Sequence, residues 1–168
     1  MKKVFLIISL SIATSLTFAQ TAASNLLLGG SIAINSSTDA DGASSGLNLN
    51  IAPKIGYFIA NNFALGAEAS YVKQSNQDPY TLFGPFVRYY ICTLGPNTKL
   101  FSQGSAEFGE NANLGLGYTT LGFDAGIAYF LNSNIAAEVA LQYKNNTSSK
   151  ATNYALNVGF QIHFAGKK

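Results

Sequence analysis

Apolar and polar residues alternate along most of this chain, which is the period expected of β-strands with one apolar face. The clearest example is the segment 154–164. Its even-numbered positions, from Tyr154 to Phe164, are Tyr, Leu, Val, Phe, Ile and Phe, whereas the odd-numbered positions between them are Ala, Asn, Gly, Gln and His. A helix would spread both sets around its axis. The pattern therefore predicts a strand over 154–164.

The same period recurs in seven other segments. It is strong over residues 47–57, 63–71, 123–129 and 135–143, and weaker over 26–34, 81–89 and 100–108. With the final segment, the sequence predicts eight strands, an even number as in bacterial single-chain β-barrels. Pro53 and Pro85 fall inside predicted strands and lack the N–H that a sheet ladder needs, so we expect local irregularity at both.

The connections between the predicted strands alternate between short and long. Short turns are expected at 58–62 and 132–134, and long polar loops at 35–45, 73–80, 109–119 and 144–151. The segment 91–99 is predicted as a longer turn on the short-turn side. Short periplasmic turns facing long extracellular loops are typical of bacterial outer-membrane barrels.

Alternation alone does not say which face is outside, because a soluble lipocalin-like barrel has the same period with its faces exchanged. Composition favours an apolar exterior. Charged residues make up only 11% of the chain and the polar faces consist mostly of Gly, Ala, Ser and Asn, whereas ordinary soluble domains are roughly 25% charged. Such a polar face suits a narrow lumen better than bulk water.

Aromatic residues lie near both ends of the predicted strands, as in the two interfacial girdles of membrane barrels. Those near the short turns are Tyr57, Phe63, Tyr89, Tyr129 and Phe164, and those near the long loops are Tyr71, Phe83, Tyr143 and Tyr154. Ten residue steps along a strand span roughly 33 Å, which a tilt of about 40° reduces to about 25 Å, the height of an apolar membrane band. The last strand has this length.

The N-terminus has the pattern of an export signal. Lys2 and Lys3 precede an apolar run over 4–12, and Ala19 ends a small-residue cleavage site. We expect residues 1–19 to be a cleaved signal peptide and 20–168 to form one barrel domain. Without Lys2 and Lys3 the chain is close to neutral, so no nucleic-acid partner is implied. A single Cys92 cannot form an internal disulfide, and no Cys and His cluster has metal-ligand spacing, so we expect no metal and no cofactor.

The chain resembles the small outer-membrane β-barrel family related to the OmpA-like and OmpX-like barrels. The resemblance rests on the turn 56–62 leading into Phe63-Ala64-Leu65-Gly66, on the segment 83–90 and on the aromatic last strand. It implies an eight-stranded antiparallel up-and-down transmembrane β-barrel in contact with outer-membrane lipid. It also implies insertion by the barrel-assembly machinery, for which Phe160, Ile162 and Phe164 are the candidate signal. The family's last strand usually ends at its aromatic residue, whereas here residues 165–168 follow Phe164.

One charged residue lies on the polar face of each of the second to seventh predicted strands. These residues are Lys54, Glu68, Arg88, Glu107, Asp124 and Glu138. The interior of an eight-stranded barrel is just wide enough for side chains to fill, so these groups must pair with each other or with trapped water. We expect Arg88 to bridge Glu68 and Glu107 on its neighbouring strands. Lys54 would relieve part of the remaining negative charge.

Two further candidate sites are weaker. His163 is the only histidine, and some small barrels are lipid A hydrolases that use a Ser and a His. It falls at the short-turn end without evident Ser and acid partners, so we expect a structural lumen histidine and no catalytic residue. Asp39 and Asp41 lie in a long loop that lacks the later acidic ligands of a calcium motif, so we expect a solvated loop.

Several functions remain open after these observations. The favoured one is a structural or surface-interaction barrel whose extracellular loops meet surface ligands, because eight strands leave little bore. The alternative is a narrow porin-like channel for small solutes. A lipid-modifying enzyme and a soluble lipocalin-like binding barrel are less favoured.

Overall fold

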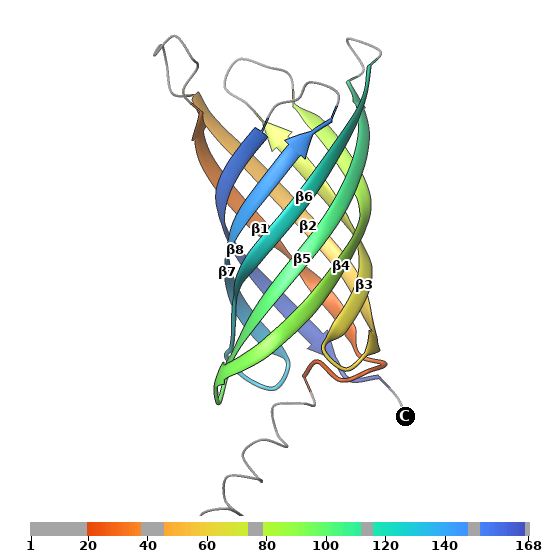
Figure 1. Cartoon of the computed structure of the whole chain (residues 1–168), viewed down its shortest axis with the longest axis vertical. Coiled ribbons are helices and arrows are strands. Elements are labelled where there is room, and N and C mark those ends of the chain that lie inside the picture. The colour runs from red at the N-terminus through yellow and green to blue at the C-terminus, as the bar shows by residue number, and fades with distance from the viewer. Residues whose placement is uncertain (1–19, 38–45, 74–78, 112–115, 148–151, 167–168) are drawn as a thin grey trace, which may run out of the picture.

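The chain folds as a closed antiparallel β-barrel in which every strand pairs with its neighbours in sequence and the last strand pairs with the first (Figure 1). The computed structural model describes residues 20–37, 46–73, 79–111, 116–147 and 152–166. The strands are β1 (Leu26–Ser37), β2 (Gly46–Ala60), β3 (Phe63–Lys73), β4 (Tyr80–Gly95), β5 (Thr98–Asn111), β6 (Leu116–Phe130), β7 (Ile135–Asn146) and β8 (Thr152–Phe164). The predicted eight-stranded up-and-down architecture is thus confirmed. In the described part of the chain, no helix is long and apolar enough to cross a membrane.

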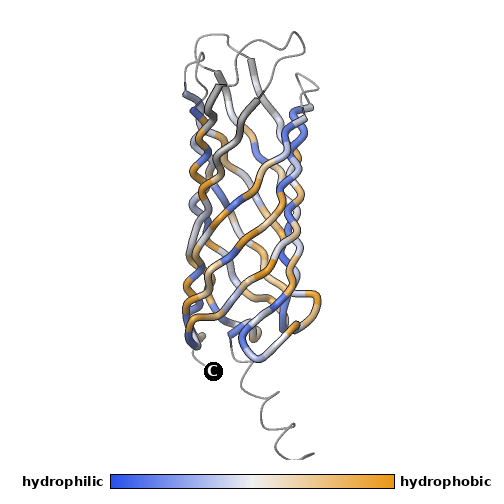
Figure 2. Tube along the Cα trace, turned by 90° about the vertical axis from the view of Figure 1, so that its left-hand side faces the viewer, coloured by the Kyte–Doolittle hydropathy of each residue, from blue (hydrophilic) through white to orange (hydrophobic). Residues whose placement is uncertain are grey.

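The alternating sequence pattern sorts side chains between the wall and the interior of the barrel. Phe164 at the end of β8 is 45% exposed on the outside, whereas its neighbour His163 is 1% exposed on the inside. The same inside-outside alternation runs along β2, β4, β6 and β7, and Figure 2 shows hydropathy changing repeatedly along the tilted strands. Because most of the large apolar residues point outward, the barrel wall is an apolar belt, whereas the interior combines polar and charged groups with a smaller set of buried aromatic residues.

The short turns and the two ends of the described chain lie together at one end of the barrel (Figure 1). Asn61–Asn62 joins β2 to β3, Pro96–Asn97 joins β4 to β5, and residues 131–134 join β6 to β7. The connections at the other end include the segments 38–45, 74–78, 112–115 and 148–151, which lie outside the described residues together with 1–19 and with Asp39 and Asp41. We call the two ends the short-turn end and the long-loop end.

The predicted long turn over 91–99 is wrong. β4 continues to Gly95 and β5 begins at Thr98, so the connection is a tight turn at Pro96–Asn97. Register shifts occur after Tyr90 and after Thr93, and residues 91–94 are exposed on both faces because this hairpin extends beyond the barrel. Exposure on both sides removes the period-two signal. With this correction, the connections of β2 to β3 and of β4 to β5 are both two-residue turns, whereas the connection of β6 to β7 over 131–134 is as long as that of β5 to β6 over 112–115.

The two prolines inside strands interrupt the ladders as predicted. The pairing of β2 with β3 is interrupted between Ile51 and Lys54, the stretch that contains Pro53. The pairing of β4 with β5 is interrupted between Phe83 and Phe86, the stretch that contains Pro85. Each proline lacks the donor that its neighbour strand would use. Both side chains point outward, so the interior is undisturbed at these positions.

Candidate functional site

The interior of the barrel holds all six charged residues that the sequence singled out. Lys54, Glu68, Arg88, Glu107, Asp124 and Glu138 are each at most 6% exposed. They come from six different strands because each occupies an inward position of its own strand. A buried charge is stable only when it is paired and hydrogen-bonded, so the pairing pattern is the main question at this site.

Arg88 forms an ion pair with Glu138, and its predicted bridge to Glu68 and Glu107 is wrong. The Nη1 atom of Arg88 lies 2.6 Å from Oε1 of Glu138. The two residues are on β4 and β7, which are not neighbours in the sheet. The lumen is narrow enough for an arginine side chain to reach across it, so spatial proximity here does not follow strand adjacency.

Gln103 on β5 is the centre of a hydrogen-bonded group that the sequence analysis missed. We call this group the middle layer, and it consists of Gln103 with Lys54, Glu68, Arg88, Asp124 and Glu138. Oε1 of Gln103 accepts from Nε of Arg88 at 3.0 Å and from Nζ of Lys54 at 3.4 Å. Its Nε2 donates to Oε2 of Glu68 at 3.0 Å and to Oδ2 of Asp124 at 3.3 Å. A neutral amide carries one acceptor and two donors, so it can join groups of opposite charge. Its inward position was the only signal in the sequence.

Lys54 and Glu68 form a second pair, with Nζ and Oε2 3.4 Å apart. They are directly opposite each other in the register of β2 and β3. Lys54 therefore offsets interior negative charge as expected. The charge that it offsets is that of its cross-strand neighbour Glu68.

Glu107 is paired nearer the long-loop end, in a third group. It accepts hydrogen bonds from Nζ of Lys144 and from the hydroxyl of Ser70, and Lys144 also donates to Ser70 at 3.2 Å. The sequence analysis had assigned Lys144 to a loop, whereas β7 continues to Asn146 and brings Lys144 over the lumen. The strands extend further toward the long-loop end than the apolar period indicates.

A small cavity of about 10 Å³ lies beside the middle layer, with Asp124 and Asn157 in its lining. Oδ1 of each residue is buried and has no hydrogen-bond partner among the described residues. Lys54 lines the same cavity. The space is about that of one water molecule, which could accept from a lysine and donate to two such oxygens.

An aromatic layer fills the short-turn end of the interior. We call it the floor cluster, and it consists of Phe58, Tyr90, Phe101, Phe130 and His163. The Phe130 and His163 ring centroids are 5.3 Å apart, and the guanidinium of Arg88 lies 4.3 Å from the Phe101 centroid. The floor cluster is therefore in direct contact with the middle layer above it. The residues are contributed by five strands.

The segment Gln20–Asn25 lies under the floor cluster, a feature that the sequence did not reveal. Thr21 is fully buried; its Oγ1 donates to Oδ1 of Asn62 at 2.5 Å and accepts from Nζ of Lys99 at 2.7 Å. Nδ1 of His163 lies 2.8 Å from the carbonyl oxygen of Gln20. We call this segment the N-terminal strap. The N-terminal strap covers the interior of the barrel at its short-turn end.

The structure places His163 inside the floor cluster, and its structural role stays a prediction. Its ring is enclosed by Phe58, Tyr90 and Phe130, and its Nδ1 contacts the backbone of the N-terminal strap. Its Nε2 is buried and has no hydrogen-bond partner among the described residues. A catalytic histidine needs a nucleophile and an orienting group within hydrogen-bond reach. Among the described residues no group of three or more His, Cys, Asp or Glu side chains is placed to hold a metal ion.

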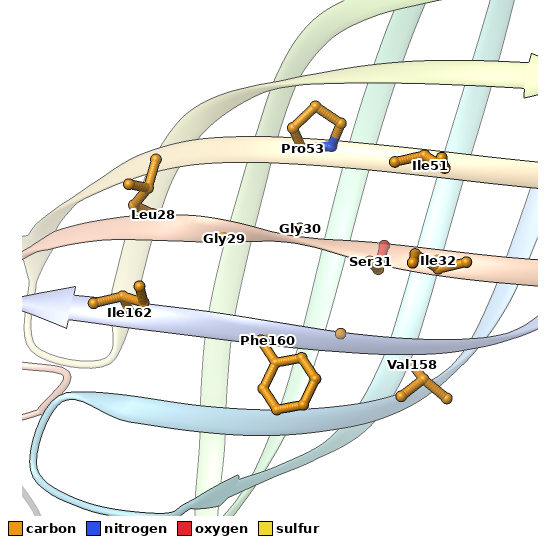
Figure 3. Close-up of a pocket in the computed structure, with 11 residues that line it drawn as sticks. Leu28, Gly29, Gly30, Ser31, Ile32, Ile51, Pro53, Val158, Phe160 and Ile162 are labelled. Atoms are coloured by element: carbon orange, nitrogen blue, oxygen red, sulfur yellow. The ribbon is translucent and has the colours of Figure 1, made fainter.

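The outside of the barrel carries the predicted aromatic residues and an apolar hollow. Tyr143 pairs with Tyr154 at the long-loop end, with ring centroids 5.4 Å apart, and Phe63 pairs with Tyr89 at the short-turn end, at 6.4 Å. The hollow is a groove of about 480 Å³ across β8, β1 and β2 (Figure 3). Its walls include Leu28, Ile32, Ile51, Pro53, Val158 and Phe160. We call it the wall groove.

The candidate assembly residues Phe160, Ile162 and Phe164 all point outward from β8 and are 58%, 36% and 45% exposed. Phe160 and Ile162 also line the wall groove. Their position on the strand that closes the barrel against β1 is compatible with the predicted role, which stays a prediction.

Comparisons with known proteins agree with this architecture. No family model and no curated protein matches the sequence. Among solved structures, the chain is similar to the N-terminal β-barrel domain of Pseudomonas aeruginosa OprF, with a TM-score of 0.63 and 14% identity over 84% of this chain and 98% of that one. It is also similar to neisserial surface protein A (TM-score 0.51, 14% identity, 83% and 96% covered) and to a de novo designed transmembrane β-barrel (0.51, 14%, 86% and 98%).

At this level of identity the likeness is one of fold. Together with the closed eight-stranded sheet and the apolar wall, it defines the chain as a small transmembrane β-barrel of the outer-membrane type. The resemblance stated from the sequence is thus confirmed for the fold.

Proposed function

We propose that this chain is an integral outer-membrane barrel with a side-chain-filled lumen, acting as a structural or surface-interaction protein and not as an enzyme. The observation that carries the proposal is the stacking of filled layers along the lumen. From the long-loop end these are the Lys144–Glu107 pair, the layer around Gln103, the floor cluster and the N-terminal strap. An interior in which side chains of opposite strands touch leaves no continuous path for a solute.

The apolar wall gives the proposal its location. Large apolar side chains such as Leu141 and Phe160 are 69% and 58% exposed, and every strand carries such residues. Exposed apolar surface marks contact with a membrane or another protein, and its extent around the whole barrel favours hydrocarbon. Every backbone group in hydrocarbon needs a partner within the protein, which a closed barrel supplies. Outer-membrane lipid is therefore the proposed partner of the wall, and the barrel-assembly machinery the proposed partner during insertion.

Surface recognition is assigned to the long-loop end. There the connections between strands span residues 38–45, 74–79, 112–115 and 147–151, compared with Asn61–Asn62, Pro96–Asn97 and residues 131–134 at the short-turn end, so three of the four are longer than any short turn. A rigid barrel that presents longer connections is a common platform for binding. The proposal is that ligands on other surfaces meet the protein at this end.

Planar-bilayer recording tests the filled lumen. We expect the reconstituted wild-type protein to show no defined single-channel steps. A reproducible conductance that changes in Arg88→Ala but not in the outward control Val139→Ala would overturn the proposal in favour of a narrow channel. Membrane location is tested separately by gel migration of the membrane fraction before and after heating. A chain that stays in the soluble fraction after export would contradict it.

A further inference from the structure

We propose that the wall groove binds one hydrocarbon chain of a membrane lipid from the leaflet at the short-turn end. The inference rests on the proposed membrane setting of the barrel. It concerns the seam where β1 meets β8, which is the place where the barrel closes. In Figure 3 the side chains of Pro53 and Ile51 lie on one side of the β1 backbone and those of Phe160 and Val158 on the other.

The groove exists because an outward position of β1 has no side chain. Gly30 lies between the outward residues Leu28 and Ile32, which are 43% and 51% exposed. In the register, Gly30 is opposite Pro53 on β2 and opposite Phe160 on β8. Two bulky side chains therefore flank a strip of bare backbone, and the hollow runs along the strand between them.

The width of the groove selects a thin occupant. Its two walls stand on β8 and β2, which are two strand spacings apart, or roughly 9.5 Å. Apolar groups touch at about 4 Å, so one polymethylene chain fits between the walls and contacts both. An α-helix, which is roughly 10–12 Å across with its side chains, does not fit.

The lining and the volume agree with a hydrocarbon ligand. No charged residue lines the groove, and its walls consist of Leu, Ile, Val, Phe and Pro side chains. The volume of about 480 Å³ lies within the range of roughly 300–1,000 Å³ that is usual for small-molecule sites. Ser31 is the one lining residue with a polar side chain, which is too little to hold a lipid headgroup, so the site is assigned to the hydrocarbon chain alone.

The height of the groove identifies the leaflet. Leu26 is level with Tyr57 and Phe164, which belong to the aromatic girdle at the short-turn end. Gly30 is four residues further along β1, or roughly 13 Å along the strand and roughly 10 Å above the girdle after tilt. The groove runs from Leu28, roughly 5 Å above the girdle, to Ile32, roughly 15 Å above it. Its centre therefore lies below the middle of a belt about 25 Å tall, within reach of a chain anchored at the short-turn end.

A second copy of the barrel is the competing occupant. A stable interface between copies usually buries about 1,200–2,000 Å² in total. The outer surface of a second barrel is convex as well, so it would need a ridge that fits the narrow groove. A flexible chain adapts to the groove without such a match. Oligomeric state is nevertheless measured in the experiment below.

Native mass spectrometry of the barrel released from nanodiscs tests the proposal, with phosphatidylethanolamine and phosphatidylglycerol carrying palmitoyl and oleoyl chains as the probe lipids. The key pair is Val158→Trp and Val139→Trp. These valines face each other across β7 and β8 and are 51% and 50% exposed, but only Val158 lines the groove. Heat-modifiable gel migration first shows that each variant has inserted and folded.

We expect wild type and Val139→Trp to retain one lipid after the others are stripped, and Val158→Trp to retain it at least fivefold less. A second pair removes wall instead of filling the groove: Ile51→Ala should weaken retention, whereas Ile127→Ala, at 45% exposure against 41% for Ile51, should not. Equal retention within both pairs, or no retained lipid in wild type, would overturn the proposal. If the wild-type protein were a dimer and Val158→Trp were a monomer, the groove would be assigned to a second copy of the chain instead.

Discussion

The guanidinium of Arg88 on β4 and the carboxylate of Glu138 on β7 meet across the lumen at 2.6 Å, although their strands are not adjacent in the sheet. Each partner has further bonds: Nε of Arg88 donates to Gln103 at 3.0 Å, and Oε2 of Glu138 accepts from Gln161 at 3.2 Å. The pair therefore links opposite walls of the barrel and holds the middle layer together.

Arg88→Met should destabilise the barrel by about 3–5 kcal/mol, because it leaves the buried carboxylate of Glu138 without its cation. The double variant Arg88→Met/Glu138→Leu should recover most of that loss, since a hydrophobic pair of similar volume removes the unpaired charge. The stability of both variants is measured by urea unfolding in detergent micelles. The loss of the compact gel band of unheated samples reports the unfolded fraction. If the loss of stability in the double variant equalled the sum of the losses in Arg88→Met and Glu138→Leu, the two residues would not be coupled.

Gln103→Leu should cost at least about 3 kcal/mol in the same unfolding measurement. The substitution removes four hydrogen bonds, all to charged groups, and such bonds contribute roughly 1.5–3 kcal/mol each before relaxation. Ser102→Ala, at the neighbouring outward position, is the control and should change stability by less than about 0.5 kcal/mol. Equal effects of the two substitutions would contradict the central role of Gln103.

The fold was predictable from the sequence because each strand separates its side chains onto two faces, and the wall is apolar enough to mark the outside. Which interior groups meet was not predictable by the same means. Lys54 and Glu68 are cross-strand neighbours, so register alone would pair them. The contact of Arg88 with Glu138 depends on the diameter of the lumen and the reach of the side chain, neither of which appears in a strand pattern.

The N-terminal strap and the wall groove escaped prediction for different reasons. Residues Gln20–Asn25 have no period, and their burial depends on the shape of the closed barrel end. The groove depends on Gly30 standing between Pro53 and Phe160, which requires the register of three strands. The hairpin beyond Tyr90 lost its period because both faces are exposed.

Thr21→Val should loosen the N-terminal strap without unfolding the barrel. It removes the hydroxyl that bonds Lys99 and Asn62 and keeps the shape of the side chain. Hydrogen exchange is the measurement: the amides of Ser24, bonded to Phe58 O at 2.8 Å, and of Asn62, bonded to Thr21 O at 2.7 Å, should exchange roughly tenfold faster.

Amides in the middle of β8 should exchange unchanged in this variant. Thr147→Val is the control, because it breaks an exposed hydrogen bond to Thr119 at the long-loop end and should leave the amides of Ser24 and Asn62 as in wild type. Faster exchange throughout the barrel in Thr21→Val would mean that the strap is part of the global folding unit and does not open locally.

Gly66→Ala adds one methyl group at an inward position of β3 and should be strongly destabilising. Gly66 and its cross-strand partner Gly56 make room for the ring of Phe86. A Cβ at Gly66 would lie 2.6 Å from two atoms of that ring and 2.2 Å from the carbonyl oxygen of Ile55. The ring can shift but the backbone cannot, so Phe86→Leu should relieve only part of the damage. We expect a loss of stability above about 3 kcal/mol, at or beyond the usual range for overpacking.

The control substitution is Gly104→Ala. Its added methyl group would meet only a Val87 methyl at 3.7 Å and should be neutral or stabilising by up to about 1 kcal/mol. Unfolding midpoints that are the same for the two alanine variants would show that the interior is not packed around Phe86 as described.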